Sequence, residues 1–267
     1  MTLQKNMAPS PLLKALFSAQ GAARLETIVR PGLLCVFDFD GTLAPIVAQP
    51  HQAQLPAEVR KRLLTLQRLA PVAILTGRAL DDIAARLDFK ADFMVGNHGL
   101  EGLPDSDQRR MTFELECAGW HEQLASAFSD HEHFDPGFLM EDKKISLSVH
   151  YRHVQDQTHA QLQLTQLFAT LTPPPRVIGG KCVFNLLPQG AGDKGTAFEA
   201  LMQLSGAKTA VYVGDDVTDE DVFRLARQDL LSIRIGEHVA SAAQFFVADH
   251  SDILPLLDDL IVRLEAV

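Results

Sequence analysis

The sequence is poor in cysteine and has no long uninterrupted run of apolar residues. Its three cysteines, Cys35, Cys117 and Cys182, are an odd number and lack the spacing of metal ligands, so we expect reduced thiols. Residues 1–30 hold no continuous apolar stretch, which argues against a signal peptide or a membrane anchor. These absences favour a cytoplasmic protein that does not bind membranes.

Positive charge is also scarce, with 24 Lys and Arg residues against 34 Asp and Glu residues and a formal net charge of -10. Binding to nucleic acid or to anionic membranes needs clustered Lys and Arg, so we expect neither partner. A phosphorylated small molecule is still compatible with this charge, because a metal ion and a few local cations can dominate one cleft. With 46% hydrophobic residues, the 267-residue chain is long enough to bury the core of one large or two modest domains.

Several motifs of other enzyme classes are missing too. No glycine-rich Walker loop occurs, which disfavours a nucleotide-dependent kinase, and there is no His-Glu-x-x-His zinc motif. The His131-Glu132-His133 segment has no third ligand and is typical of a solvated loop. Cys35 lies inside an apolar run, so we interpret it as a core residue and not as a nucleophile.

The most informative segment is the apolar run 33–37, which leads into Asp38-Phe39-Asp40-Gly41-Thr42. The run is short, β-branched and aromatic, as expected for a strand buried on both faces of a parallel sheet. Asp38 and Asp40 then lie at the carboxyl end of the strand, where open α/β sheets bind ligands. An ordinary strand-to-turn junction is the simpler alternative, since Asp and Gly are common in turns.

Strands and helices alternate on both sides of a central insertion. The patterns predict strands at 72–76, 93–95, 209–213, near 231–235 and at 245–247, and helices at 57–70, 79–87, 195–205 and from 253 to the end. Leu12, Leu13, Leu16 and Phe17 are spaced for a short amphipathic helix ahead of this region. Such alternation predicts an α/β fold with a Rossmann-like parallel sheet.

The pattern changes between residues 102 and 182. Residues 144–151 alternate strictly between polar and apolar, which predicts a strand with one wet face in an antiparallel sheet. Helical patterns around 118–129 and 157–171 flank it, and 182–187 is another strand-like run. We therefore expect an N-terminal arm at 1–30, a core at 31–101 and 183–267, and an inserted α+β subdomain at 102–182.

Polar groups that follow the predicted strands could meet at one edge of the sheet. They are Asp38 and Asp40, Thr76, Lys194 at a helix start, and the Asp215-Asp216-Val217-Thr218-Asp219 set. Several carboxylates in one cleft stay ionised only if a hard cation or a Lys compensates them. Oxygen ligands at this density suit Mg2+, and a carboxylate beside such an ion is able to attack phosphorus.

These motifs, in this order, resemble the four motifs of the haloacid-dehalogenase-like phosphatase superfamily. The resemblance implies that Asp38 is the nucleophile, that Asp40 is the general acid and base, and that Thr76 and Lys194 hold the phosphoryl group. It further implies that Mg2+ is bound by the Asp38 carboxylate, the Asp40 carbonyl and Asp215, while Asp216 and Asp219 support the metal shell or orient Lys194. Dehalogenating relatives lack the second aspartate, so Asp40 favours hydrolysis of a phosphate ester.

A narrower resemblance is to the trehalose-6-phosphate phosphatase family, and it spans roughly residues 31–250. It rests on five segments: 96–101, 141–143, 150–152, 179–181 and 214–220. It implies a sugar-phosphate substrate, with trehalose 6-phosphate hydrolysed to trehalose and phosphate, and a specificity cap at 102–182. The substrate-binding residues expected from it are Gly77, Arg78, Asn97, His98, Glu141, Lys143 and Asn185.

Alternatives to these assignments stay open in the sequence. Glu141 and Lys143 could form a solvated charged turn, and His98 could satisfy a backbone group of its own turn. Asn185 stands where family members usually carry Glu, which puts the sugar preference in question. A related phosphatase of the sucrose-6-phosphate or mannosyl-3-phosphoglycerate type, or a catalytically silent sugar-phosphate binding domain, is the competing function. A monomer is favoured over an oligomer.

Overall fold

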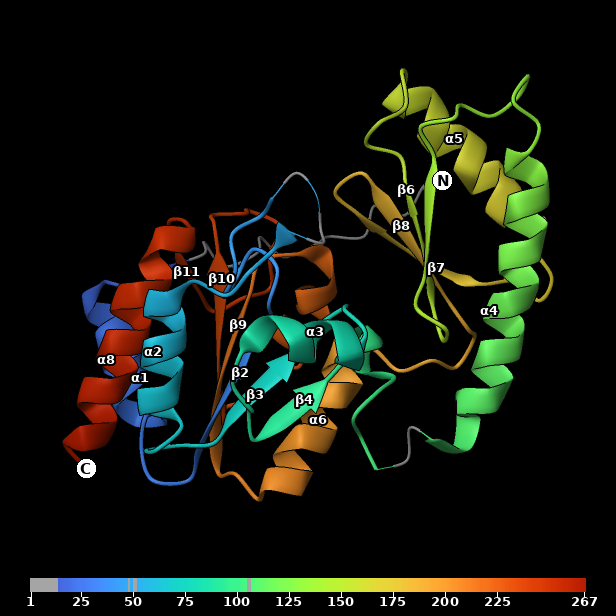
Figure 1. Ribbon diagram of the computed structural model, residues 1–267. Helices are drawn as coiled ribbons and strands as arrows, with labels where there is room; N and C mark the ends of the chain where they lie inside the picture. Colours follow the sequence, from blue (N-terminus) through green and yellow to red (C-terminus); the bar gives the residue numbers. More distant parts are fainter. Residues whose placement is uncertain (1–13, 48, 50–51, 105–106) are drawn as a thin grey trace, which may run out of the picture. The chain divides into compact units, whose positions relative to one another are not determined.

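The computed structural model describes residues 14–47, 49, 52–104 and 107–267, and it divides into two compact units (Figure 1). The first, here called the parallel-sheet unit, comprises described residues up to Thr76, together with Asp81–Met94 and Lys194–Val267. The second, the antiparallel unit, comprises Gly77–Leu80 and Val95–Asp193. The antiparallel unit therefore extends on both sides of the expected insertion at 102–182.

The parallel-sheet unit is built on a seven-stranded sheet in the order β1-β11-β10-β9-β2-β3-β4. Neighbours from β1 through to β3 pair in parallel, as the alternation of strands and helices predicted. Every residue of β2, β3 and β9 is buried, which explains their continuous apolar sequences. The strands are β1 (Lys14–Ala15), β2 (Leu33–Phe37), β3 (Val72–Leu75), β4 (Phe93–Val95), β9 (Thr209–Gly214), β10 (Leu230–Ile235) and β11 (Phe245–Val247).

Helices cover both faces of this sheet, with α1, α2 and α8 together on one side in Figure 1. In α8 the buried residues recur every three to four positions, so one face of the helix packs inward. Ser18 caps α1 by accepting a hydrogen bond from the Gly21 N–H. The helices are α1 (Ala19–Ile28), α2 (Ala57–Leu66), α3 (Leu80–Leu87), α6 (Lys194–Ser205), α7 (Glu220–Phe223) and α8 (Ile253–Glu265), with short 3-10 turns at Val217–Asp219 and His250–Asp252.

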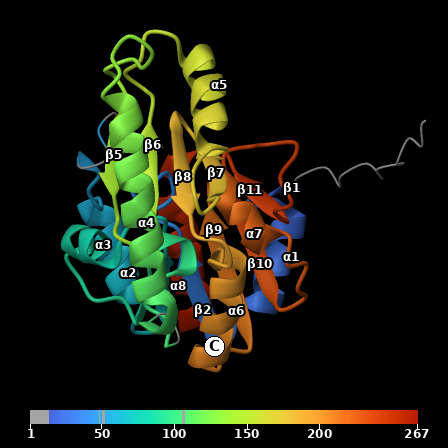
Figure 2. The ribbon, with the colours of Figure 1, turned by 90° about the vertical axis from the view of Figure 1, so that its right-hand side faces the viewer.

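The antiparallel unit holds a four-stranded sheet in the order β5-β6-β8-β7. Its strands are β5 (Leu139–Asp142), β6 (Leu147–His150), β7 (Arg176–Gly180) and β8 (Val183–Leu187), all paired antiparallel. Helices α4 (Asp107–Phe128) and α5 (Gln157–Phe168) lie against the strands in Figure 2. Leu147, Val149 and Leu186 share one core with Trp120 and Leu164 of these helices, so Ser148 and Asn185 lie on the other face of the sheet.

Some of the expectations differ from the structure beyond small shifts at the ends of elements. The strand expected at 144–151 starts only at Leu147, because Lys144 has a positive φ of 69° in the hairpin turn. The helix expected at 118–129 begins at Asp107; exposed Met111 and Leu115 obscure its buried stripe. The expected helix around Leu16 is wrong, since α1 begins at Ala19, and Leu12 and Leu13 lie outside the described residues. Residues 14–30 of the expected arm form β1, α1 and their connections within the parallel-sheet unit.

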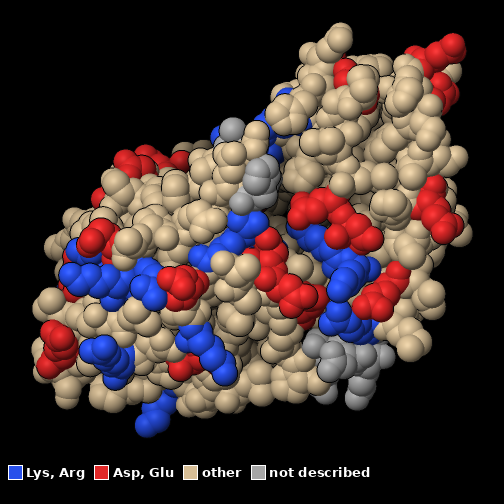
Figure 3. All heavy atoms as spheres, viewed as in Figure 1, with Lys and Arg blue, Asp and Glu red and all other residues tan. Residues whose placement is uncertain are grey.

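Basic and acidic side chains lie next to one another on the face drawn in Figure 3. Arg62 on α2 forms ion pairs with Glu58 one turn earlier and with Asp258 on α8, at N–O distances of 3.0 and 2.7 Å. Among the described residues, no helix combines the length and the apolar character needed to cross a membrane. All three cysteines are free, and burial raises the pKa of the Cys35 thiol to about 12, in keeping with a core position.

Candidate active site

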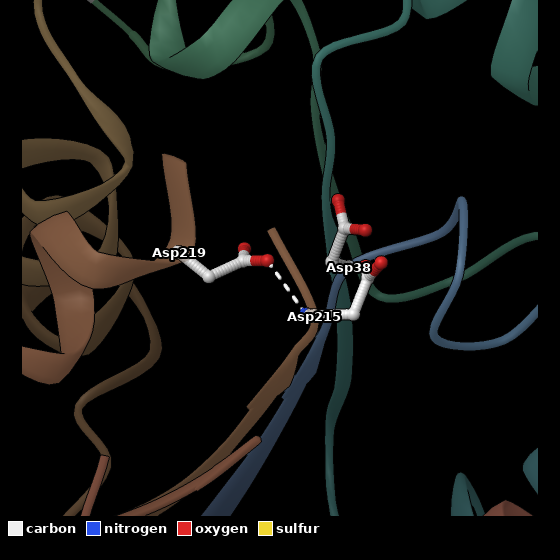
Figure 4. Close-up of side chains that lie close together, drawn as sticks. All are labelled: Asp38, Asp215 and Asp219. Carbon is white, nitrogen blue, oxygen red and sulfur yellow. Dashed lines mark hydrogen bonds between the residues drawn. The ribbon is translucent and has the colours of Figure 1, made fainter. Parts of the chain in front are cut away.

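The carboxyl ends of β2 and β9 bring two aspartates together. Phe37 pairs with Val213 across these strands, and the Asp38 N–H donates to the Val213 carbonyl at 2.9 Å. This register sets Asp38 beside Gly214 and Asp215 at the same end of the sheet. Asp38, Asp215 and Asp219 each offer one carboxylate oxygen, and these three oxygen atoms lie within 4.8 Å of one another (Figure 4). The sequence-based expectation of carboxylates meeting at this edge is thus met for these three.

Lys194 joins two of these carboxylates from the first position of α6. Its Nζ donates to Asp38 Oδ1 and to Asp219 Oδ1, each at 2.7 Å. Lys194 is 2% exposed, so both bonds are shielded from water. The ammonium group therefore holds the Asp38 side chain in one orientation and neutralises part of the negative charge around it.

Asp219 is fully occupied by donors from the protein. Oδ1 also accepts from the Tyr212 hydroxyl at 2.6 Å, and Oδ2 accepts from the backbone N–H groups of Asp215 and Asp216 at 2.8 Å each. With Lys194, these donors use the four lone-pair positions of a carboxylate. Figure 4 shows the bond from Asp219 to the Asp215 backbone. Asp219 thus anchors Lys194 and the turn after β9, and Asp38 and Asp215 remain as carboxylates for a cation.

A tight turn after β2 carries the second aspartate past Asp215. Gly41 has a φ of 82°, and a Cβ built on it would lie 2.1 Å from Asp215 Oδ2, so only glycine fits here. Thr42 Oγ1 donates to Asp215 Oδ1 at 3.3 Å. Asp40 forms an isolated bridge with Ala44 and is partly exposed, which keeps this carboxylate accessible to solvent.

The other two core candidates have distinct surroundings. Thr76 follows β3, the strand beside β2, and is 1% exposed. Asp216 begins the 3-10 turn Val217–Asp219 and accepts a hydrogen bond from the Asp219 N–H, while the Asp219 side chain accepts from the Asp216 N–H. Asp216 therefore stabilises the turn that presents Asp215 and Asp219.

The electrostatics of this site favour a bound cation. Burial raises the pKa of Asp38 well above its usual range, with Asp219 and Asp215 adding to the effect and Lys194 opposing it. Burial, followed by the charges of Asp219 and Asp216, raises the pKa of Asp215 to about 7. Burial would lower the pKa of Lys194, but Asp219 and Asp38 raise it, so Lys194 stays charged. With all three carboxylates ionised, the one ammonium group leaves two negative charges, and a divalent cation with oxygen ligands would balance them.

The remaining candidates belong to the antiparallel unit, where Gly77, Arg78, Asn97, His98 and Lys143 cluster. The Asn97 N–H donates to the Arg78 carbonyl at 2.8 Å, and Lys143 Nζ donates to the Gly77 carbonyl at 3.2 Å. A Cβ on Gly77 would lie 2.4 Å from the His98 ring, so glycine is needed for this contact. Asn97 is completely buried and His98 is 6% exposed.

Glu141 and Asn185 lie on the face of the four-stranded sheet that α4 and α5 leave uncovered. Glu141 pairs with Ser148 across β5 and β6, and Ser148 pairs with Asn185 across β8, so these three form one row. Ser148 Oγ donates to Asn185 Oδ1 at 2.7 Å, and His150 Nε2 lies 3.1 Å from Glu141 Oε2. The hydrogen bond from His150 lowers the pKa of Glu141.

Reasoning from the sequence gave no role to four polar residues that bind the candidate residues of the two units. Tyr212 and Thr42 bind Asp219 and Asp215, and Ser146 and Ser148 bind Asn97 and Asn185. Tyr212 is hidden in an apolar strand, where tyrosine is a common β-former. Tyr212 lies two residues before Gly214, and alternate strand residues share a face. This position could have indicated that the Tyr212 side chain lies on the same side of β9 as Gly214, next to the Asp215–Asp219 turn.

Comparison with known proteins identifies the family. The sequence model described as trehalose-phosphatase matches residues 36–251, which is most of the chain. The chain belongs to the trehalose-phosphatase family. Within this family it is 34% identical over 197 residues to a trehalose-phosphate phosphatase of Mycobacterium avium, covering 72% of this chain and 50% of that protein. It is 28% identical to trehalose-phosphate phosphatase B of Arabidopsis thaliana, covering 73% and 56%. The chain thus spans about half the length of these curated relatives.

Solved structures agree on the fold of this trehalose-phosphatase family member. A trehalose-6-phosphate phosphatase related protein superposes with a TM-score of 0.69 at 25% identity, covering 86% of this chain and 97% of the other. The C-terminal domain of the Candida albicans trehalose-6-phosphate phosphatase superposes with a TM-score of 0.76 at 20% identity, covering 94% and 99%. The expected haloacid-dehalogenase-like α/β core with a separate antiparallel sheet is confirmed.

Proposed function

We propose that this chain is a Mg2+-dependent phosphatase that hydrolyses trehalose 6-phosphate to trehalose and phosphate. The observation that carries the proposal is the buried Asp38–Lys194–Asp219 network beside Asp215, in a chain of the trehalose-phosphatase family. The family supports the substrate, and the carboxylates and Lys194 support the chemistry. A silent domain that only binds sugar phosphates does not need a complete set of catalytic groups. The presence of Asp38, Asp40, Lys194 and Asp215 therefore supports the phosphatase over the silent domain.

Asp38 acts as the nucleophile. One of its carboxylate oxygens attacks phosphorus, the bond from phosphorus to the sugar oxygen breaks, and an aspartyl-phosphate forms on Asp38. Asp40 gives its proton to the departing sugar oxygen, since it lies two residues away on the more exposed side of the turn. Water then attacks the same phosphorus, Asp40 takes the proton from that water, and the bond to Asp38 breaks to release phosphate.

Lys194 and Thr76 hold the phosphoryl group during both steps. Lys194 is fixed by Asp219, so its charge is in place before the substrate arrives and needs no reorganisation. Asp38 and Asp215, with the carbonyl of Asp40, would hold Mg2+. When bound, the ion would neutralise charge on the phosphate oxygens and keep both carboxylates ionised.

Residues of the antiparallel unit recognise the sugar. Glu141 offers a carboxylate and Lys143 an ammonium group, and a sugar rich in hydroxyls binds to such groups through charge-assisted hydrogen bonds. Asn185 contributes an amide on the same sheet face as Glu141, while Gly77, Arg78, Asn97 and His98 shape the neighbouring loops. A site of this kind discriminates against sugars that leave its polar groups without partners.

A substrate panel tests this function. Phosphate release is measured from trehalose 6-phosphate, glucose 6-phosphate, sucrose 6-phosphate and mannosyl-3-phosphoglycerate, each with Mg2+ and with EDTA. We expect metal-dependent release with a clear preference for trehalose 6-phosphate. Preference for another ester would keep the roles of Asp38 and Asp40 but refute the sugar assignment, and no release from any ester would refute the enzymatic function.

A further inference from the structure

A buried polar cluster in the antiparallel unit links three separate segments of the chain. The segments are the Gly77–Leu80 stretch, the loop at 96–101 and the hairpin turn that follows β5. Asn97 lies where they meet: its N–H donates to the Arg78 carbonyl, and its Oδ1 accepts from Ser146 Oγ at 2.9 Å. Its Nδ2 lies 3.5 Å from the Lys143 carbonyl, a long contact to the same hairpin turn. Asn97, which belongs to the loop at 96–101, therefore contacts both of the other segments.

The backbone around Asn97 is held in an unfavourable conformation. Asn97, His98 and Gly99 have φ values of 48°, 58° and 108°, three consecutive residues in the left-handed region. Asn and His occur in this region more often than most non-glycine residues, but each of them still costs about 1 kcal/mol or more there. The surrounding hydrogen bonds have to offset that cost, and strain of this kind is concentrated at functional sites.

Asn97 is not placed to touch a ligand. Its side chain is completely buried, and Ser146, its partner, is 2% exposed. Both side chains are instead occupied with each other inside the unit. A sugar-binding role for Asn97, which the family resemblance implied, therefore does not fit a residue that solvent does not reach.

The hairpin turn carries the residue that the cluster controls. The Lys143 N–H donates to the Ser146 carbonyl at 3.0 Å, and the Lys143 carbonyl accepts from the Ile145 N–H at 2.9 Å. Asp142 Oδ1 accepts from the Lys144 N–H at 2.7 Å, which supports the positive φ of Lys144. The turn is thus closed on itself, and the Ser146–Asn97 hydrogen bond ties it to the loop at 96–101.

We propose that Asn97 and Ser146 are positioning residues that fix Lys143 for sugar recognition. They hold the hairpin turn so that Lys143 Nζ stays near the Gly77 carbonyl, 3.2 Å away, in the segment that directly follows Thr76. This inference rests on the proposed function in one respect, the role of Lys143 toward the sugar. The positioning itself is a property of the unliganded protein.

The first test uses Ser146→Ala, which removes the hydroxyl that donates to Asn97. For each variant kcat and KM are measured with trehalose 6-phosphate and with para-nitrophenyl phosphate, which carries no sugar. Loss of one buried hydrogen bond predicts a fall of about tenfold in the ratio of kcat/KM for the two esters, mainly through KM for the sugar ester. Ser129→Ala is the matched control, because Ser129 makes a hydrogen bond to the Ala125 carbonyl at 2.8 Å on the exposed end of α4, away from this cluster.

An unchanged ratio of the two kcat/KM values would overturn the proposal. This includes the case in which both values fall equally, because a structural defect would affect both esters. Melting curves of the two variants show whether the fold is kept.

The second test does not depend on activity. Brief labelling with acetic anhydride, followed by mass spectrometry, reports how readily each lysine amine reacts. We expect the Lys143 amine to react at least about threefold faster in Ser146→Ala than in the wild type, with the exposed Lys181 unchanged as internal control. Equal Lys143 reactivity in both proteins would overturn the positioning role. Inactivity of the wild type toward trehalose 6-phosphate would instead refute the proposed function, and the labelling would still decide the inference.

Discussion

Replacement of Tyr212 by Phe isolates one hydrogen bond at the centre of the candidate active site. The hydroxyl donates to Asp219 Oδ1 at 2.6 Å, in a position with no solvent exposure. The ring packs edge-on against Phe198 and Phe223, with centroids 5.9 and 5.8 Å away. Phe keeps this packing, so the substitution removes the hydroxyl and little else.

The expected effect follows from the charge on the acceptor. A hydrogen bond to a charged group contributes about 1.5–3 kcal/mol, and we expect Tyr212→Phe to lower the free energy of unfolding by that amount. Asp219 also holds Lys194, so looser anchoring should reduce kcat by about tenfold while KM for the sugar ester stays nearly constant. Urea denaturation followed by circular dichroism gives the first quantity, and phosphate release gives the second.

The chain offers a matched control in Tyr151, its other tyrosine. Its hydroxyl accepts a hydrogen bond from Gln161 Nε2, also at 2.6 Å, but this partner is neutral and exposed. We expect Tyr151→Phe to cost only about 0.5–1.5 kcal/mol and to leave kcat unchanged. If Tyr212→Phe is no more destabilising than Tyr151→Phe and keeps full kcat, the argument that Tyr212 anchors Asp219 is refuted.

Three further predictions concern the metal turn and the sugar-facing sheet. Gly41→Ala would drive a Cβ into the Asp215 carboxylate, so kcat should fall about 100-fold, as measured by phosphate release; near-normal kcat would contradict the packing argument. Mg2+ at about 100 times its Kd should stabilise the wild type by about 2.7 kcal/mol in melting experiments with an EDTA control, and Asp215→Asn should abolish most of this gain. An equal gain in that variant would remove Asp215 from the metal site. The lowered pKa of Glu141 means that the Glu141–His150 pair stabilises the protein above the ordinary Glu pKa and loses this effect as the pH falls through the lowered value. His150→Ala should therefore raise the Glu141 pKa in an NMR titration, and an unchanged pKa would show that His150 is not its cause.

The catalytic edge of the sheet was predictable because strong local patterns determine it. β2 and β9 are fully buried, so their sequences are continuous apolar runs whose ends are easy to locate. Parallel pairing then requires that Asp38 and Asp215 lie at the same edge. The family resemblance already offered Asp219 as a residue that orients Lys194. The structure was needed to show that this one carboxylate accepts four hydrogen bonds, since no short-range pattern reveals them.

The antiparallel unit was less predictable, and its strands explain why. β5 is mostly exposed and lies at the sheet edge, while β7 follows three prolines and ends in Gly179-Gly180. Neither has the alternation that marked the region of β6. The role of Ser146 was equally hidden, because its partner Asn97 is 49 residues away in the sequence. Long-range polar contacts of this kind are determined by tertiary packing and leave no local pattern.

The central claim is that Asp38 is the nucleophile that cleaves trehalose 6-phosphate. The most direct measurement compares phosphate release from this ester by the wild type and by Asp38→Asn, with Mg2+ present and melting curves recorded for both. The account predicts steady release by the wild type and a loss of at least about 1,000-fold in Asp38→Asn, with the fold intact. Comparable turnover by the two proteins would contradict the assignment of Asp38.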